Sequence, residues 1–246
     1  AARVIVNRVW LHLFGEALVR TPGNFGATGD RPSNPMLLDY LAVRLRQQNW
    51  SLKSLIREIV LSDTYQASAD ETPQALATDP GNRLFGRQNR RRLEAEAIRD
   101  AILAVSGCLD PAVGGPSQPL GPDNLRRTVY ARIGRFRQEE TLSLFDFPSA
   151  TVTSEKRSVT NVPLQRLFFL NSDFVLQRAQ ALAERLHVSA PGDEGRIRAA
   201  YRLLFGRAPT SDEQKLGLIF LAAGGSEAWR DYAQVLISSN EFLFVE

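Results

Sequence analysis

The chain has 246 residues, of which 43% are hydrophobic and 23% charged, and these fractions are ordinary for a globular protein. The formal net charge is only +3, and of the 30 basic residues just Lys53, Lys156 and Lys215 are lysine. Nucleic-acid binders usually place lysines against the phosphate backbone, so nucleic acid is not the expected partner. The single cysteine, Cys108, rules out an internal disulfide, and no run of 18 apolar residues predicts a membrane span.

The first third of the chain predicts three helices. Residues 4–14 are rich in large apolar side chains and stop at Gly15, which is typical of a helix with a glycine at its C-terminal cap. Asn34 followed by Pro35 supplies an N-cap and a first-turn proline for the second helix. Ser51 caps the third helix, in which apolar residues recur at a spacing of three and four.

The middle of the chain predicts one helix, one loop and one strand. Residues 92–106 follow the helical apolar period, and Gly107 ends them. Residues 110–123 contain four prolines and several glycines, which predicts a long irregular loop. Residues 128–133 alternate apolar and polar side chains, and this is the one convincing strand-like run.

The last third predicts helices only. A long helix begins at Pro163 and reaches about His187, and Thr210 with Glu213 forms a capping box for a later helix. The other helical patterns cover residues 194–205, 211–223 and 227–240. We therefore predict a mainly α, irregular multi-helix domain over residues 1–246, with long ordered loops and at most a small β-hairpin. Residues 190–246 are a candidate helical subdomain, and the chain is expected to be a fragment of a longer protein.

The segment 144–171 is the best candidate for a site, because it places polar side chains beside large aromatic ones. We predict an Asp146–Arg157 ion pair across it, and Thr160 or Asn161 as the cap of the helix that Pro163 begins. A structural clasp is favoured over catalysis here. The candidate clasp residues are Asp146, Arg157, Thr160, Asn161, Gln165 and Asn171.

Two arginine-rich runs form a candidate basic patch for an acidic partner. Its members are Arg90, Arg91, Arg92, Arg126, Arg127, Arg135 and Arg137. Internal pairing with nearby acids is the favoured alternative. The only histidines, His12 and His187, have no second ligand at helical spacing, so no metal and no cofactor are expected in this chain.

Several long motifs together resemble one known family. They are residues 7–15 (Asn-Arg-Val-Trp-Leu-His-Leu-Phe-Gly), 32–35 (Pro-Ser-Asn-Pro), 145–148 (Phe-Asp-Phe-Pro) and 239–242 (Ser-Asn-Glu-Phe). This pattern resembles the planctomycete cytochrome-associated domain of unknown function that is numbered 1553. One departure is Arg166, where the family usually has alanine.

The resemblance implies the C-terminal domain of a larger exported protein in the periplasm or cell envelope. It also implies N-terminal domains of the same polypeptide as partners, and a c-type haem in a separate domain. No catalytic residues are established for the family, and the leading hypothesis is a non-catalytic binding or assembly module. The alternatives are a polysaccharide-acting enzyme with convergent carboxylates, such as Asp30, Asp39 and Asp146, and a module that binds polysaccharide or another acidic polymer through its arginines.

Overall fold

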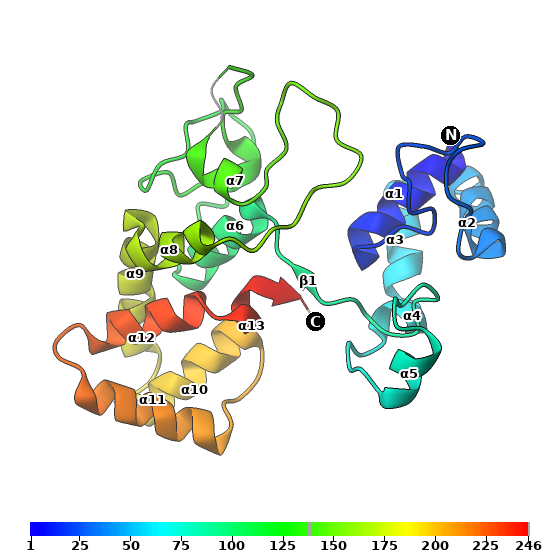
Figure 1. The fold of residues 1–246 in the computed structure, drawn as a ribbon. Coiled ribbons are helices and arrows are strands. Elements are labelled where there is room, and N and C mark those ends of the chain that lie inside the picture. The colour runs from blue at the N-terminus through cyan, green and yellow to red at the C-terminus, as the bar shows by residue number, and fades with distance from the viewer. Residues whose placement is uncertain (137–138, 246) are drawn as a thin grey trace. The chain divides into compact units, whose positions relative to one another are not determined.

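The computed structural model describes residues 1–136 and 139–245, which are mainly helical as predicted (Figure 1). The chain forms two compact units, residues 1–91 and 92–245. No described helix combines the length and apolar character that a membrane span requires.

The first unit is a small helical body built on the packing of α1 against α2. Its helices are α1 (Ala2–Phe14), α2 (Pro35–Gln47), α3 (Leu52–Val60), α4 (Asp63–Gln66) and α5 (Pro73–Thr78). The core includes Trp10 and Phe14, whose rings stack with centroids 4.1 Å apart. The predicted caps are confirmed: Asn34 and Ser51 accept hydrogen bonds from backbone N–H groups of α2 and α3, and Gly15 adopts the left-handed conformation after α1.

A buried asparagine fixes the loop that follows α1. Asn7 is fully buried, and its amide both donates to the Val19 carbonyl oxygen (3.0 Å) and accepts from the Val19 N–H (2.8 Å). Two complementary bonds satisfy both ends of the side-chain amide, so its burial carries no unpaired polar group.

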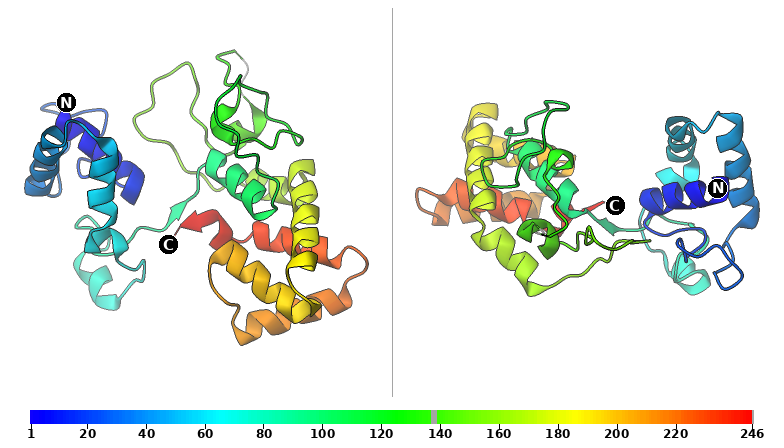
Figure 2. Two further views of the ribbon diagram at one scale, coloured as in Figure 1. Left: turned by 180° about the vertical axis from the view of Figure 1, so that it is seen from behind. Right: turned by 90° about the horizontal axis from the view of Figure 1, so that it is seen from above.

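The second unit packs around α9, the longest helix in the described part of the chain, which packs across α12 (Figures 1 and 2). Its α-helices are α6 (Ala95–Val105), α7 (Glu140–Leu144), α8 (Pro163–Asn171), α9 (Asp173–Ser189), α10 (Gly192–Phe205), α11 (Ser211–Ala223), α12 (Ala228–Ile237) and α13 (Asn240–Leu243). One apolar core joins α6 and α9 to α10, α12 and α13. Helices α10–α13 contribute to the same core as the helices before them, and the described residues form two units that meet in sequence at residues 91 and 92.

The two ends of the second unit meet in a short sheet. β1 (Arg91–Arg92) pairs with β2 (Phe244–Val245), and the Leu93 N–H donates to the Leu243 carbonyl oxygen at 2.8 Å. The paired strands are distant in sequence, so the sheet is not a hairpin.

Two predictions of secondary structure are wrong. Residues 128–133 are not a strand but begin with the 3₁₀ turn η1 (Thr128–Tyr130), and Val129 and Ile133 are exposed. The long helix predicted from Pro163 is two helices, because Ser172 adopts an extended conformation between α8 and α9. The acidic side chain of Asp173 in the first turn favours the start of α9 there, although the Ser172 hydroxyl makes no capping bond.

Candidate functional site

The ends of the loop between α7 and α8 are tied together by Asp146 and Thr160. The Asp146 carboxylate accepts the Thr160 N–H at 2.7 Å and the Thr160 hydroxyl at 2.9 Å. Asp146 has a φ of 62°, a left-handed backbone that aspartate tolerates better than most residues. The same bonds explain why the predicted cap of α8 is wrong. Thr160 is bound to Asp146, and the N-cap position falls on Val162, which has no capping side chain.

The middle of this loop is held by an acid from α6 rather than by Asp146. Arg157 donates to both oxygens of Glu96 (2.7 and 2.8 Å), with Glu94 3.2 Å away. The predicted Asp146–Arg157 pair is therefore wrong. Burial opposes ionisation of Glu96, but the hydrogen bonds from Arg157, a bond from its own backbone N–H and the charge of Arg157 together lower the pKa of this carboxyl group.

Gln165 is the centre of the clasp. Its side chain is 1% exposed, and its amide donates to the Leu144 carbonyl oxygen at 2.8 Å. Arg92 donates to the Gln165 amide oxygen (2.5 Å) and to the Thr160 carbonyl oxygen (2.7 Å). Burial lowers the pKa of the Arg92 guanidinium. Arg92, which the sequence assigns to a basic patch, therefore belongs to the clasp.

The remaining two clasp candidates are peripheral. Asn161 and Asn171 are exposed, and within the described residues neither side chain makes a hydrogen bond. The clasp of the structure thus comprises Asp146, Thr160, Gln165 and Arg92, with Arg157 attached separately to α6.

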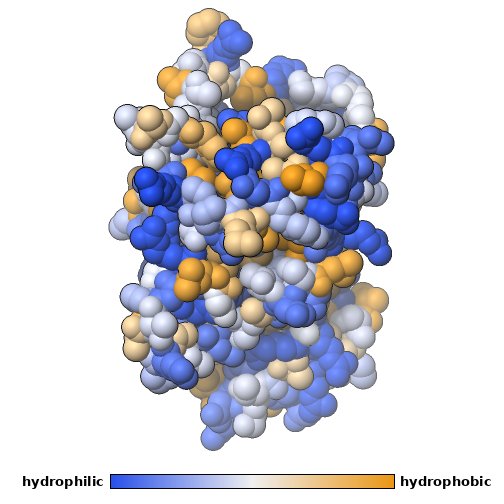
Figure 3. Space-filling model, turned by 90° about the vertical axis from the view of Figure 1, so that its right-hand side faces the viewer, coloured by the Kyte–Doolittle hydropathy of each residue, from blue (hydrophilic) through white to orange (hydrophobic). Residues whose placement is uncertain are grey.

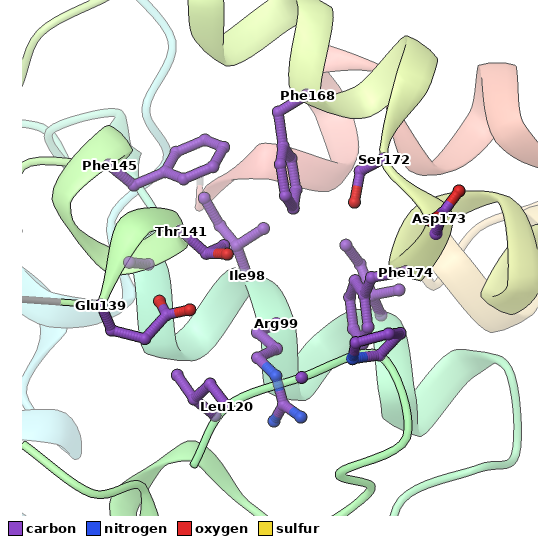
Figure 4. A pocket seen from close by; sticks show the side chains of 14 residues that line it. Ile98, Arg99, Leu120, Glu139, Thr141, Phe145, Phe168, Ser172, Asp173 and Phe174 are labelled. Atoms are coloured by element: carbon purple, nitrogen blue, oxygen red, sulfur yellow. The ribbon is translucent and has the colours of Figure 1, made fainter.

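Beside the clasp, the second unit contains a pocket of about 280 Å³ that opens to solvent (Figure 4). Three phenylalanines, Phe145, Phe168 and Phe174, provide most of its aromatic surface. The rings of Phe145 and Phe168 meet edge to face with centroids 5.3 Å apart. The rest of the lining is Ala95, Ile98, Arg99, Ile102, Leu120, Gly121, Pro122, Glu139, Thr141, Ser172 and Asp173.

Arg99 builds one wall of the pocket. It is 5% exposed, and it donates to the backbone carbonyls of Asn124 and Arg126 (2.9 Å to Arg126) and to the Thr128 hydroxyl (3.2 Å). Its guanidinium lies on the side of Leu120, away from Phe145 and Phe168 (Figure 4). Burial lowers the pKa of this guanidinium. Arg99 therefore holds residues 124–128, directly after the loop predicted at residues 110–123, and that loop supplies Leu120, Gly121 and Pro122 to the pocket.

Three polar side chains face the space between the aromatic rings: Glu139, Thr141 and Ser172 (Figure 4). Glu139 uses one carboxylate oxygen to cap α7, accepting the Leu142 N–H at 2.9 Å. The Thr141 and Ser172 hydroxyls make no hydrogen bond within the described residues. Sequence reasoning missed these residues, because they come from two segments that only the fold brings together. The feature of the sequence that indicated this region was the aromatic content of residues 144–171.

The arginines of the predicted basic patch are largely engaged inside the protein. Arg91 donates to the His12 carbonyl oxygen (2.6 Å), and Arg127 lies 3.7 Å from Asp100. Arg126 donates to the carbonyls of residues 112, 114 and 116, with its guanidinium 4.4 Å from the Tyr130 ring centroid. Arg90 and Arg135 are exposed, and Arg137 lies outside the described residues. Most hydrogen-bond partners of these arginines are backbone carbonyl oxygens rather than the nearby acidic side chains that the sequence suggested.

The carboxylates of the enzyme hypothesis have separate local surroundings. Asp39 pairs with Arg3, and Asp30 is exposed in a loop of the first unit, whereas Asp146 serves the clasp of the second. Among the described residues no group of three or more histidine, cysteine or acidic side chains is arranged to hold a metal ion.

The fold is mainly helical, and its second unit carries a small open pocket with an aromatic lining. The chain belongs to the PSD1 family, proteins of unknown function (DUF1553), whose sequence model matches residues 1–221. No curated protein and no solved structure matches the chain.

Proposed function

We propose that this chain is a non-catalytic binding and assembly module of a larger exported, cytochrome-associated bacterial protein. The observation that carries the binding role is the pocket of the second unit, where hydroxyls without partners in the described residues face an aromatic lining. Ligand sites commonly have this composition, an apolar lining with a few convergent polar groups.

Exposed apolar side chains on single helices support the assembly role. Met36, Tyr40 and Val43 form an exposed stripe on α2, at helical spacing. Leu216, Ile219 and Phe220 do the same on α11. On the face drawn in Figure 3, apolar side chains lie scattered among hydrophilic ones. The exposed stripes on α2 and α11 can each pack against another domain, and the N-terminal domains of the same polypeptide are the partners that we propose for them.

The family resemblance supports the exported, cytochrome-associated and planctomycete setting. A c-type haem is attached through Cys-x-x-Cys-His, and this sequence has only Cys108. Any such haem therefore belongs to a separate domain of the full-length protein.

The test is the full-length reading frame and its product. We expect an export signal and a Cys-x-x-Cys-His motif upstream, haem staining of the full-length protein but not of this chain, and recovery in the cell-envelope fraction. Co-purification of the separately expressed N-terminal region with this chain checks the assembly role. A reading frame that has neither the signal nor the motif contradicts the exported, cytochrome-associated setting.

A further inference from the structure

We infer that the pocket of the second unit binds one ring of a neutral sugar. This inference deepens the proposed binding role and rests on it. The pocket, at about 280 Å³, is just below the roughly 300–1,000 Å³ of sites for drug-sized ligands, so it suits a single ring.

The lining matches the two kinds of surface that a sugar ring presents. Its C–H faces are apolar and pack on aromatic rings, which Phe145, Phe168 and Phe174 provide. Its hydroxyl groups both donate and accept. The Thr141 and Ser172 hydroxyls can take either role, and Glu139 keeps an oxygen that its capping bond does not use.

The charge balance favours a neutral ligand over an ion. Glu139 faces the pocket, and Arg99 in the same wall interacts electrostatically with it. Asp100 lies 4.0 Å from Arg99 and 3.7 Å from Arg127, so the positive charges of Arg99 and Arg127 balance the negative charges of Asp100 and Glu139. Neither an organic cation nor an anion therefore meets an uncompensated charge at the depth of the pocket. Asp173 is exposed at the rim, where water screens its charge.

The pocket is open on one side, where the exposed Gly121 and Pro122 form part of its edge. A free monosaccharide and the terminal unit of a glycan present the same ring to such an opening. The sugar chemistry is therefore common to both sources, and the experiment separates them.

The test is titration of the 246-residue chain with glucose, galactose, mannose and xylose, their methyl glycosides, and neutral oligosaccharides. Binding is followed by saturation-transfer NMR and calorimetry. We expect saturable binding of at least one neutral sugar, weakened roughly tenfold by Phe168→Ala, because an aromatic contact contributes on the order of this factor. Tighter binding of oligosaccharides than of monosaccharides identifies a glycan end as the source.

Ser172→Ala is the second variant, because it removes one hydroxyl group and no internal hydrogen bond within the described residues. It keeps the test valid if Phe168→Ala disturbs folding, which circular dichroism reveals. Phe25→Ala, in the loop between α1 and α2, is the matched control, an exposed phenylalanine outside the pocket, and it should leave binding unchanged.

Three results overturn the inference: no neutral sugar binds, binding is insensitive to both pocket variants, or tetramethylammonium or inorganic phosphate binds at the pocket in preference to every sugar. None of these bears on the export signal, the haem motif or co-purification, so failure here is distinct from failure of the proposed setting and assembly role.

Discussion

Arg157 and Glu96 are joined by two parallel hydrogen bonds of 2.7 and 2.8 Å, although 61 residues separate them in the chain. This fork-to-fork geometry is the strongest form of side-chain ion pair. It attaches the loop between α7 and α8 to α6, and Arg157 also lies 5.1 Å from the centroid of the Phe147 ring.

Replacing Arg157 by glutamine should free this loop without unfolding the second unit. Both partners are about a quarter exposed, so the expected loss of unfolding free energy is about 1 kcal/mol. Cleavage by thermolysin within residues 145–162 should become several-fold faster. Arg166→Gln is the control, since Arg166 is exposed and makes no bond within the described residues. Equal cleavage rates in the two variants would show that the pair does not hold the loop.

Gln165→Met should be more costly, because it leaves the Leu144 carbonyl oxygen without its donor and removes one acceptor from Arg92. We expect a loss of about 2 kcal/mol in urea unfolding, the usual cost of an unsatisfied buried group. Gln177→Met, at an exposed position of α9, should change little. The double variant Arg92→Met with Gln165→Met should lose less than the sum of the single changes. Additive losses would rule out coupling between the two side chains.

The stability of the second unit should fall in acid through Glu213. Hydrogen bonds from Arg207 lower the pKa of Glu213 from its ordinary 4.5 to about 2, against the opposing effect of burial. A depressed folded-state pKa stabilises the fold above the ordinary value, and this contribution is lost as the pH falls from about 4.5 to 2. Urea unfolding at pH 7 and pH 3 should show a smaller acid loss in Glu213→Gln than in the wild type. An unchanged acid loss in the variant would count against this role.

Gly217 is placed where a methyl group does not fit. A Cβ there would lie 2.6 Å from the Tyr232 hydroxyl oxygen and 3.0 Å from Cδ1 of Ile197. Gly217→Ala should therefore lower the free energy of unfolding by roughly 1–3 kcal/mol through overpacking, despite the better helix propensity of alanine. Gly225→Ala is the control, because nothing lies within 4 Å of its Cβ position. A melting temperature at or above that of the control would contradict the packing argument.

The features that the sequence predicted well are those decided by neighbours in the chain. Asn34 and Ser51 cap their helices, and Thr210 with Glu213 forms the expected capping box, because each bond spans only three residues. The partner of Arg157 is a different case. Several acidic residues in the sequence could pair with Arg157. The partner is Glu96 because the fold places α6 next to the loop that contains Arg157.

The pocket was not predictable for the same reason. Its lining comes from α6, the loop around Leu120, the start of α7 and the junction of α8 with α9. The alternation in residues 128–133 misled because its backbone pairing within the described residues is limited to one isolated bridge between Ala131 and Gln118, and Val129 is left 68% exposed.

The two long loops of the second unit are held in place by arginine hydrogen bonds to two chemically different kinds of acceptor. Arg99 and Arg126 hold residues 112–126 through backbone carbonyl oxygens, which take up no proton in the acid range. Arg157 holds the other loop through Glu96, whose carboxylate is lost on protonation. Because the pKa of Glu96 lies below its ordinary 4.5, only acid below that pH should release this loop, while the loop held through backbone carbonyls stays in place.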